Sequence, residues 1–97
     1  MDASKCQAVL IASETGSFST AAEQLNYTQS GITRMISSLE EELEFSLFIR
    51  SKKGVRLTEN GKLMLPYFRE IVESSQIAQE MSDDIKGVVR GSITIAW

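Results

Sequence analysis

The side chains best suited to binding chemistry in this 97-residue chain lie close together, between residues 29 and 34. They are a carboxamide, two hydroxyls and a guanidinium, with no acid among them: Gln29, Ser30, Thr33 and Arg34. A carboxamide can make two hydrogen bonds to an adenine edge, and a guanidinium can do the same to guanine or hold a phosphate. Hydroxyls meet either base edges or phosphates. The group therefore predicts a helix face that reads double-stranded DNA.

A run of positive charge follows this polar group. Between Phe45 and Leu57 every charged residue is basic, and the cations are Arg50, Lys52, Lys53 and Arg56. Two short apolar runs, 47–49 and 55–57, flank a centre in which Gly54 can supply a positive φ, which is typical of a β-hairpin. We expect this hairpin, 47–57, to lie on the DNA backbone or in the adjacent minor groove, where its cations add salt-dependent affinity.

The net charge of −3 hides this segregation, because acids gather further along the chain. Between residues 69 and 84 a single cation stands against five acids, which are Glu70, Glu73, Glu80, Asp83 and Asp84. On charge alone, either run is equally consistent with an ordinary solvated surface. A second interpretation therefore stays open, in which the chain is a coiled-coil adaptor for another protein and has no role on DNA.

Composition excludes several kinds of active site. The chain has no histidine and one cysteine, Cys6, so it can build neither a Cys/His metal site nor an internal disulfide. It also lacks the histidine base of serine or cysteine catalysis, and no paired carboxylates lie in an apolar context, so we expect no enzymatic activity and no cofactor. A lone thiol, no signal peptide and no membrane-spanning run favour a cytoplasmic location without a membrane partner.

Two helices are expected ahead of the polar group and a third is expected to carry it. Residues 3–14 form the first, which Gly16 ends, and Ser19 caps a short second helix to about residue 25. Asn26 suits a tight left-handed turn. Thr28 then caps the third helix. Two helices joined by such a turn indicate a helix-turn-helix, whose second helix, 28–43, enters a major groove.

The third helix has an apolar stripe opposite its polar face. The stripe recurs at spacings of 4, 3 and 4 and comprises Ile32, Ile36, Leu39 and Leu43. Three acids end this helix, at Glu40, Glu41 and Glu42. Acids at a helix C-terminus oppose the macrodipole, so they are not expected to stabilise the helix.

A long fourth helix, 59–86, is expected after its cap at Thr58. Pro66 lies inside it and removes one backbone hydrogen bond, so we expect a bend there rather than an end, and Gly87 is expected to close the helix. Beyond Pro66 the apolar residues recur at spacings of 4 and 3, which is typical of a coiled-coil seam. This seam predicts a homodimer that pairs through Tyr67, Ile71, Ser74, Ala78, Met81 and Ile85.

The last residues, 88–97, change pattern. Ile93, Ile95 and Trp97 alternate with Thr94 and Ala96, as in a β-strand, and a lone strand has no partner in this chain. We therefore expect the chain to be the front part of a longer protein. The expected fold is mainly α with a small β-hairpin wing. A winged helix-turn-helix, 1–58, precedes a linker and dimerisation helix, 59–87, and then a hinge and the first strand of a further domain, 88–97.

In order and spacing, these residues resemble the N-terminal region of the LysR-type transcriptional regulators. The resemblance covers roughly residues 3–95 and includes the turn, the recognition helix, the wing and the start of the long helix. Its matching positions are Gly16-Ser17-Phe18-Ser19, Ala21-Ala22, Leu25, Thr28-Gln29-Ser30, Thr33, Ile36, Leu39-Glu40, Leu43, Leu47-Phe48, Arg50, Val55, Leu57-Thr58, Gly61 and Leu63.

The resemblance implies a role for each of these parts. Residues matching the family's DNA-contacting positions are Thr28, Gln29, Ser30, Thr33 and Arg34 on the recognition helix, and Arg50, Lys52, Lys53 and Arg56 in the wing. The long helix matches one that pairs antiparallel with its copy in a dimer. The strand from Ser92 matches the start of an effector-binding domain, which in the family senses a small molecule and assembles dimers into tetramers.

Three positions depart from the family pattern, of which Asn60 replaces a common alanine and is expected to matter little. Gly31 stands where alanine is usual and weakens the first helical turn by up to about 1 kcal/mol. Glu44 stands where glycine usually follows the recognition helix. Because a non-glycine residue in left-handed geometry costs roughly 1–2 kcal/mol, the turn at Glu44 is expected to differ.

Overall fold

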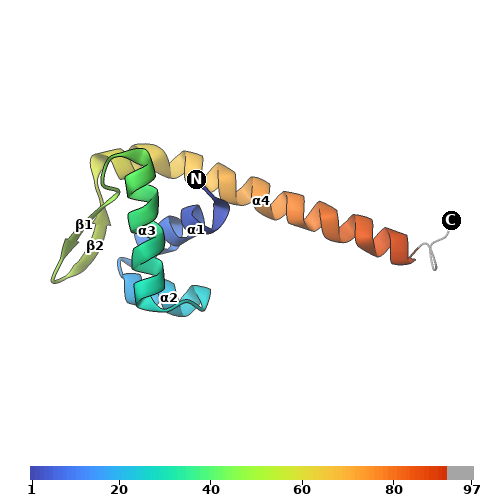
Figure 1. The fold of residues 1–97 in the computed structure, drawn as a ribbon, viewed down its shortest axis with the longest axis horizontal. Helices are drawn as coiled ribbons and strands as arrows, with labels where there is room; N and C mark the ends of the chain where they lie inside the picture. Colours follow the sequence, from blue (N-terminus) through green and yellow to red (C-terminus); the bar gives the residue numbers. More distant parts are fainter. Residues whose placement is uncertain (92–97) are drawn as a thin grey trace.

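The computed structural model describes the backbone of residues 1–91 and the side chains of residues 1–87. In Figure 1, three helices and a hairpin gather at one end, and the last helix extends away from them as an arm. The molecule is accordingly elongated, with principal extents of 58 × 25 × 19 Å. Its elements are α1 (Ala3–Thr15), α2 (Phe18–Leu25), α3 (Gln29–Leu43), β1 (Phe48–Ser51), β2 (Gly54–Leu57) and α4 (Glu59–Gly91). The expected winged helix-turn-helix with a long C-terminal helix is confirmed.

Short polar side chains start the first three helices. The Asp2 carboxylate accepts from two backbone N–H groups of α1, and the Thr28 hydroxyl accepts from the N–H of Gly31 in α3. The cap of α2 is Ser17, not Ser19 as expected. Ser17 has an extended backbone (φ −150°, ψ 129°) and its Oγ accepts from the N–H of Thr20. Ser19 lies inside the first turn of α2, which frees its hydroxyl for a contact described below.

The same three helices end in left-handed residues. Gly16, Asn26 and Glu44 have φ values of 72°, 60° and 65°. The end of α1 at Gly16 and the left-handed turn at Asn26 were expected. Glu44 is left-handed as well, although it has a side chain, and its N–H donates to the carbonyl of Glu40 at 2.8 Å. The chain therefore bears the cost of a non-glycine residue in left-handed geometry there.

One apolar core joins the helices. Val9 of α1, Ile32, Ile36 and Leu39 of α3, and Leu47 before the hairpin are fully buried. The largest fully buried side chain is Phe68 of α4, which the sequence analysis did not place in the core. Cys6 is also fully buried, and burial raises the pKa of its thiol. It therefore acts as a small apolar side chain rather than a reactive group.

The hairpin is shorter at its tip than expected. β1 and β2 pair antiparallel, with Arg50 opposite Val55 and Ser51 opposite Gly54, so only Lys52 and Lys53 lie in the turn. Gly54 has a φ of 124°, and a Cβ there would stand 2.3 Å from the carbonyl oxygen of Gly16. The N–H of Val55 donates to that same oxygen at 3.0 Å. The hairpin is thus fastened to the turn between α1 and α2.

The helix α4 is longer than expected. It continues through Pro66 and also through Gly87, the expected end, to Gly91. Nothing within 4 Å crowds Gly87, and the residue serves as an ordinary, weak helix position. The expected strand from Ser92 lies outside the described residues. Within residues 1–91, no helix is long and apolar enough to cross a membrane.

Candidate nucleic-acid interface

The N-terminal half of α3 presents its polar group to solvent. Gln29, Ser30 and Arg34 are exposed and Thr33 is half-buried, and together these four side chains line one shallow hollow. The opposite face of the helix is fully buried at Ile32. The structure therefore gathers the predicted base-reading residues on one accessible face and anchors that face to the core.

Thr28 has a structural task at the start of this face. Its Oγ1 accepts from the N–H of Gly31 at 3.0 Å and lies 3.3 Å from the hydroxyl of Ser30. A Cβ at Gly31 would stand 3.0 Å from Thr28 Oγ1, which is tighter than ordinary van der Waals contact. The glycine at this position therefore leaves room around the capping hydroxyl.

Gln29 is held from the neighbouring helix. The hydroxyl of Ser19 in α2 donates to Gln29 Oε1 at 2.8 Å. This contact crosses the turn of the helix-turn-helix and joins residues that are ten positions apart. The sequence analysis assigned Ser19 to the helix cap and so missed it as a partner of Gln29.

Arg50 stands beside this polar face. Its guanidinium carbon lies 5.0 Å from the ring centroid of Phe18, which packs edge-to-face on Phe48 at 5.3 Å. A guanidinium over an aromatic face is attracted by the ring quadrupole. Arg50 is therefore a strand residue with a fixed position, rather than part of a mobile tip.

A second hollow connects the wing to α3. Arg50 and Lys52 line it together with Ser19, Gln29 and Thr33. Arg56 lies elsewhere, since it pairs with Ile49, and successive residues of a strand point to opposite faces. The structure thus brings Arg50 and Lys52 to the recognition face. Arg56 lies on the outer face of the hairpin, where it lines hollows with Ile49.

The cations of this surface carry uncompensated charge. Within residues 1–87, neither Arg34 nor any of the four wing cations forms an ion pair. A cation that is not already paired can bind a phosphate without first breaking a contact. The surface therefore has the charge that a polyanion requires, although the whole chain is acidic.

The acids at the end of α3 have a role that sequence analysis missed. Glu40 Oε2 accepts from the N–H groups of Leu47 and Phe48, at 2.6 and 3.2 Å. These are the residues at which the wing begins. Because the partners are seven and eight residues apart in a non-helical connection, periodicity gave no signal for the contact. Glu40 fixes the wing relative to the recognition helix.

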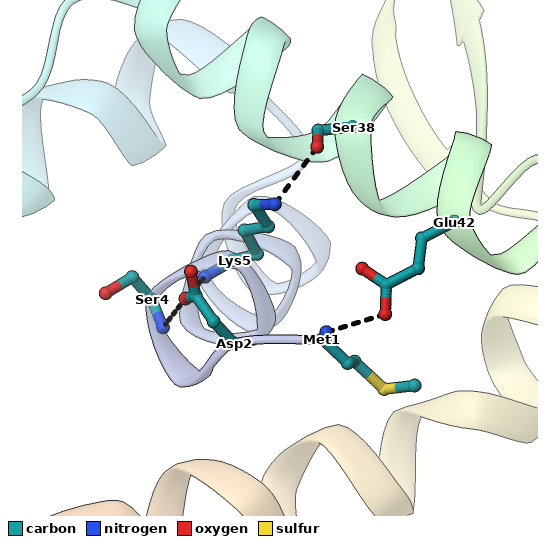
Figure 2. A network of polar contacts seen from close by, with 6 residues as sticks. All are labelled: Met1, Asp2, Ser4, Lys5, Ser38 and Glu42. Carbon is teal, nitrogen blue, oxygen red and sulfur yellow. Dashed lines mark hydrogen bonds and ion pairs between the residues drawn. The ribbon is translucent and has the colours of Figure 1, made fainter.

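A second acid near the end of α3, Glu42, holds this helix to the start of the chain. Figure 2 shows the Met1 ammonium against Glu42, at 2.6 Å, and Lys5 Nζ against Ser38 Oγ, at 3.0 Å. Both contacts join the start of α1 to the second half of α3. Ser38 is therefore engaged within the protein, whereas the first half of α3 stays open to a ligand.

The chain matches a known protein family and several curated proteins. Residues 4–62 match the model of the bacterial regulatory helix-turn-helix proteins of the lysR family. The chain is 36% identical over 96 residues to an uncharacterised helix-turn-helix transcriptional regulator from the ibpB–leuC intergenic region of Azotobacter vinelandii. That match covers 99% of this chain and 67% of the relative. It is also 38% identical over 93 residues to the regulator YbhD of Escherichia coli, covering 96% of this chain and 29% of YbhD.

Solved structures of similar fold include DNA complexes. The DNA-binding domain of CbnR, determined bound to DNA, is 29% identical and superposes with a TM-score of 0.79, covering 89% of this chain and 99% of that one. The DNA-binding domain of BenM in complex with its catB site 1 is 27% identical with a TM-score of 0.78, covering 89% and 97%. Sequence and fold agree: this chain belongs to the LysR family of bacterial regulatory helix-turn-helix proteins.

Proposed function

We propose that this chain binds double-stranded DNA sequence-specifically, as the DNA-reading part of a bacterial transcriptional regulator. The observation that carries this proposal is the acid-free polar face of α3 beside two unpaired cations of the wing. The DNA-bound relatives CbnR and BenM share its fold over most of the chain. Family membership supports the regulatory role, since the relatives are transcriptional regulators.

The recognition helix enters the major groove with its N-terminus leading. Gln29 and Arg34 meet base edges there, and Ser30 and Thr33 meet base edges or phosphates. Thr28 lies at the N-terminal end of α3. The backbone there faces a phosphate, because the first N–H groups of a helix favour an anion. These assignments follow from exposure and chemistry on one face.

The wing supplies backbone affinity. Arg50 and Lys52 reach a phosphate next to the groove that α3 occupies, and Lys53 adds charge at the turn. Arg56, on the outer hairpin face, contacts a phosphate further along the duplex or the minor groove. Charge rather than base readout is the contribution of this element.

Two copies pair through α4. The seam residues Tyr67, Met81 and Ile85 are each more than half exposed, although apolar. Leu63 and Ile77, which were not part of the expected seam, are exposed as well. At roughly 100° per residue, these five side chains fall in a stripe about 80° wide. Ala78 borders the stripe, and half-buried Ile71 lines a groove between α1 and α4.

The effector response belongs to a further domain. The chain spans 29% of YbhD, which supports a further domain in the whole protein, and the family resemblance suggests that this domain binds a small-molecule effector. In this proposal that domain also joins dimers into tetramers, and the protein works in the cytoplasm. The rival interpretation, an adaptor for another protein, assigns α4 the same pairing role but gives the wing cations no phosphate partner.

A salt titration distinguishes the two functions. Duplexes selected from genomic fragments are labelled, and their binding is followed by fluorescence anisotropy as salt increases. If the four wing cations each neutralise one phosphate, the logarithm of the binding constant falls against that of salt with a slope of roughly −3.6 per protomer. A protein that selects no sequence, or whose binding ignores salt, is an adaptor and contradicts the proposal.

A further inference from the structure

One hydrogen bond of the candidate interface joins two exposed side chains across the turn between α2 and α3. Ser19 Oγ donates to Gln29 Oε1 at 2.8 Å, and both residues line the hollow between α3 and the wing. Gln29 is exposed and long, so its carboxamide would otherwise sample many orientations. The contact therefore restrains the orientation of the Gln29 carboxamide, which must point in a defined direction to read a base.

Both ends of the contact have rigid backbones. Ser19 follows Phe18, whose ring is buried against Phe48, and it lies two residues after the Ser17 cap, in the first turn of α2. Gln29 is the first residue of α3, directly after the Thr28 cap. With both backbones anchored, the hydrogen bond needs to order only the Gln29 side chain.

We propose that Ser19 is a positioning residue, which sets the direction of the Gln29 carboxamide before DNA arrives and thereby the base that Gln29 prefers. The inference rests on the proposed DNA reading by α3. The Ser19 hydroxyl occupies one of the two lone pairs of Oε1 and leaves both donors of the amide nitrogen free, so the held side chain meets a base mainly as a donor. Guanine, adenine and thymine each offer an acceptor in the major groove, whereas cytosine offers the N4 donor. Gln29 held in this way discriminates against cytosine.

The test uses one operator in four versions. Gln29→Ala first identifies the base pair whose preference depends on Gln29, and the four duplexes differ only there. Ser19→Ala frees the carboxamide to turn its oxygen outward, so discrimination against cytosine falls by roughly two- to tenfold, the range expected when one long side chain loses its preorganisation. Affinity for a random duplex and the salt slope stay unchanged. Ser19→Thr keeps the hydroxyl and restores discrimination.

A double variant separates positioning from direct contact. In the Gln29→Ala background, Ser19→Ala has no further effect on base preference, because there is no carboxamide left to position. Gln24→Ala, an exposed change on the same helix, serves as the matched control and leaves preference and affinity as in the wild type.

The outcomes distinguish this inference from the function on which it rests. If Ser19→Ala weakens all four duplexes equally, or its effect persists without Gln29, then Ser19 contacts DNA or only supports the fold, and the inference is overturned while the proposed function stands. A wild-type chain that ignores both sequence and salt overturns the proposed function, and the role of Ser19 with it.

Discussion

Gln29 and Lys52 line the same hollow between α3 and the wing, yet their side chains do different chemistry. The carboxamide of Gln29 distinguishes base edges, whereas the ammonium of Lys52 attracts any phosphate. We expect Gln29→Ala to relax preference at one or two base pairs. Lys52→Ala should weaken all sequences alike and reduce the salt slope by about 1. Anisotropy with matched and mismatched duplexes measures both, and a uniform loss in both variants contradicts the readout assigned to Gln29.

Glu44 offers a test of backbone strain. It ends α3 at φ 65°, a conformation that costs a non-glycine residue roughly 1–2 kcal/mol, while glycine loses more entropy on folding. We expect Glu44→Gly to raise the free energy of unfolding by about 0.5–1 kcal/mol in urea denaturation. The control, Glu41→Gly, changes an exposed residue inside α3 and should lower it by about 1 kcal/mol. Destabilisation by both changes would show that Glu44 is not strained.

At the scale of elements, local sequence signals predicted the helices. The features that these signals did not predict depend on contacts between residues that are distant in the sequence. The caps at Thr28 and Gly16 and the turn at Asn26 depend on adjacent residues, so the sequence was sufficient for them. The Glu40 contact with the start of the wing depends on how the chain returns after α3, which no periodicity describes. Ser19 was assigned to the cap because Ser17 and Ser19 are chemically alike, and only the backbone distinguishes them.

Gly61 and Gly87 of α4 form a matched pair, because the same substitution meets opposite surroundings at the two positions. A Cβ at Gly61 would stand 2.5 Å from the carbonyl oxygen of Leu47 and 2.9 Å from Leu57 Cδ2. Gly61→Ala must displace the wing from α4 and should cost about 2 kcal/mol in urea denaturation. A Cβ at Gly87 meets nothing within 4 Å, so Gly87→Ala should strengthen the exposed half of α4 by up to about 1 kcal/mol.

Circular dichroism measures the predicted effect of Gly87→Ala on α4. The ellipticity at 222 nm of Gly87→Ala should persist to higher temperature than that of the wild type, since alanine favours the helix more than glycine does. Loss of helix in this variant would show that Gly87 must end or bend α4. Equal stability of Gly61→Ala and the wild type would show that the wing and α4 are not closely packed.

The whole molecule separates its functions along its length. Helix α3 and the wing lie at one end of the molecule, and α4 extends from that end as an arm (Figure 1). The recognition face and the wing cations belong to that end, whereas α4 carries the five acids between residues 69 and 84 and the exposed apolar stripe. The half of α4 nearest the core is held by buried Phe68, which lies about 100° around the helix from Tyr67. One face of α4 therefore packs within the chain while another stays available to a partner. This division explains why some residues of the expected seam are partly buried within the chain while others are exposed.

The last prediction concerns the dimer that this arrangement favours. A charge in the middle of the stripe would be buried unpaired on association, so Met81→Glu should shift the chain to monomers in sedimentation velocity. Its affinity for a single half-site should stay within about twofold, because the α3 face and the wing are unchanged. Binding to two half-sites spaced by a helical turn should lose its cooperativity. Gln76→Glu adds the same charge to an exposed position on the opposite side of α4 and should leave the dimer intact. If both variants remain dimeric, two copies pair through another surface, and the stripe on α4 serves a different partner.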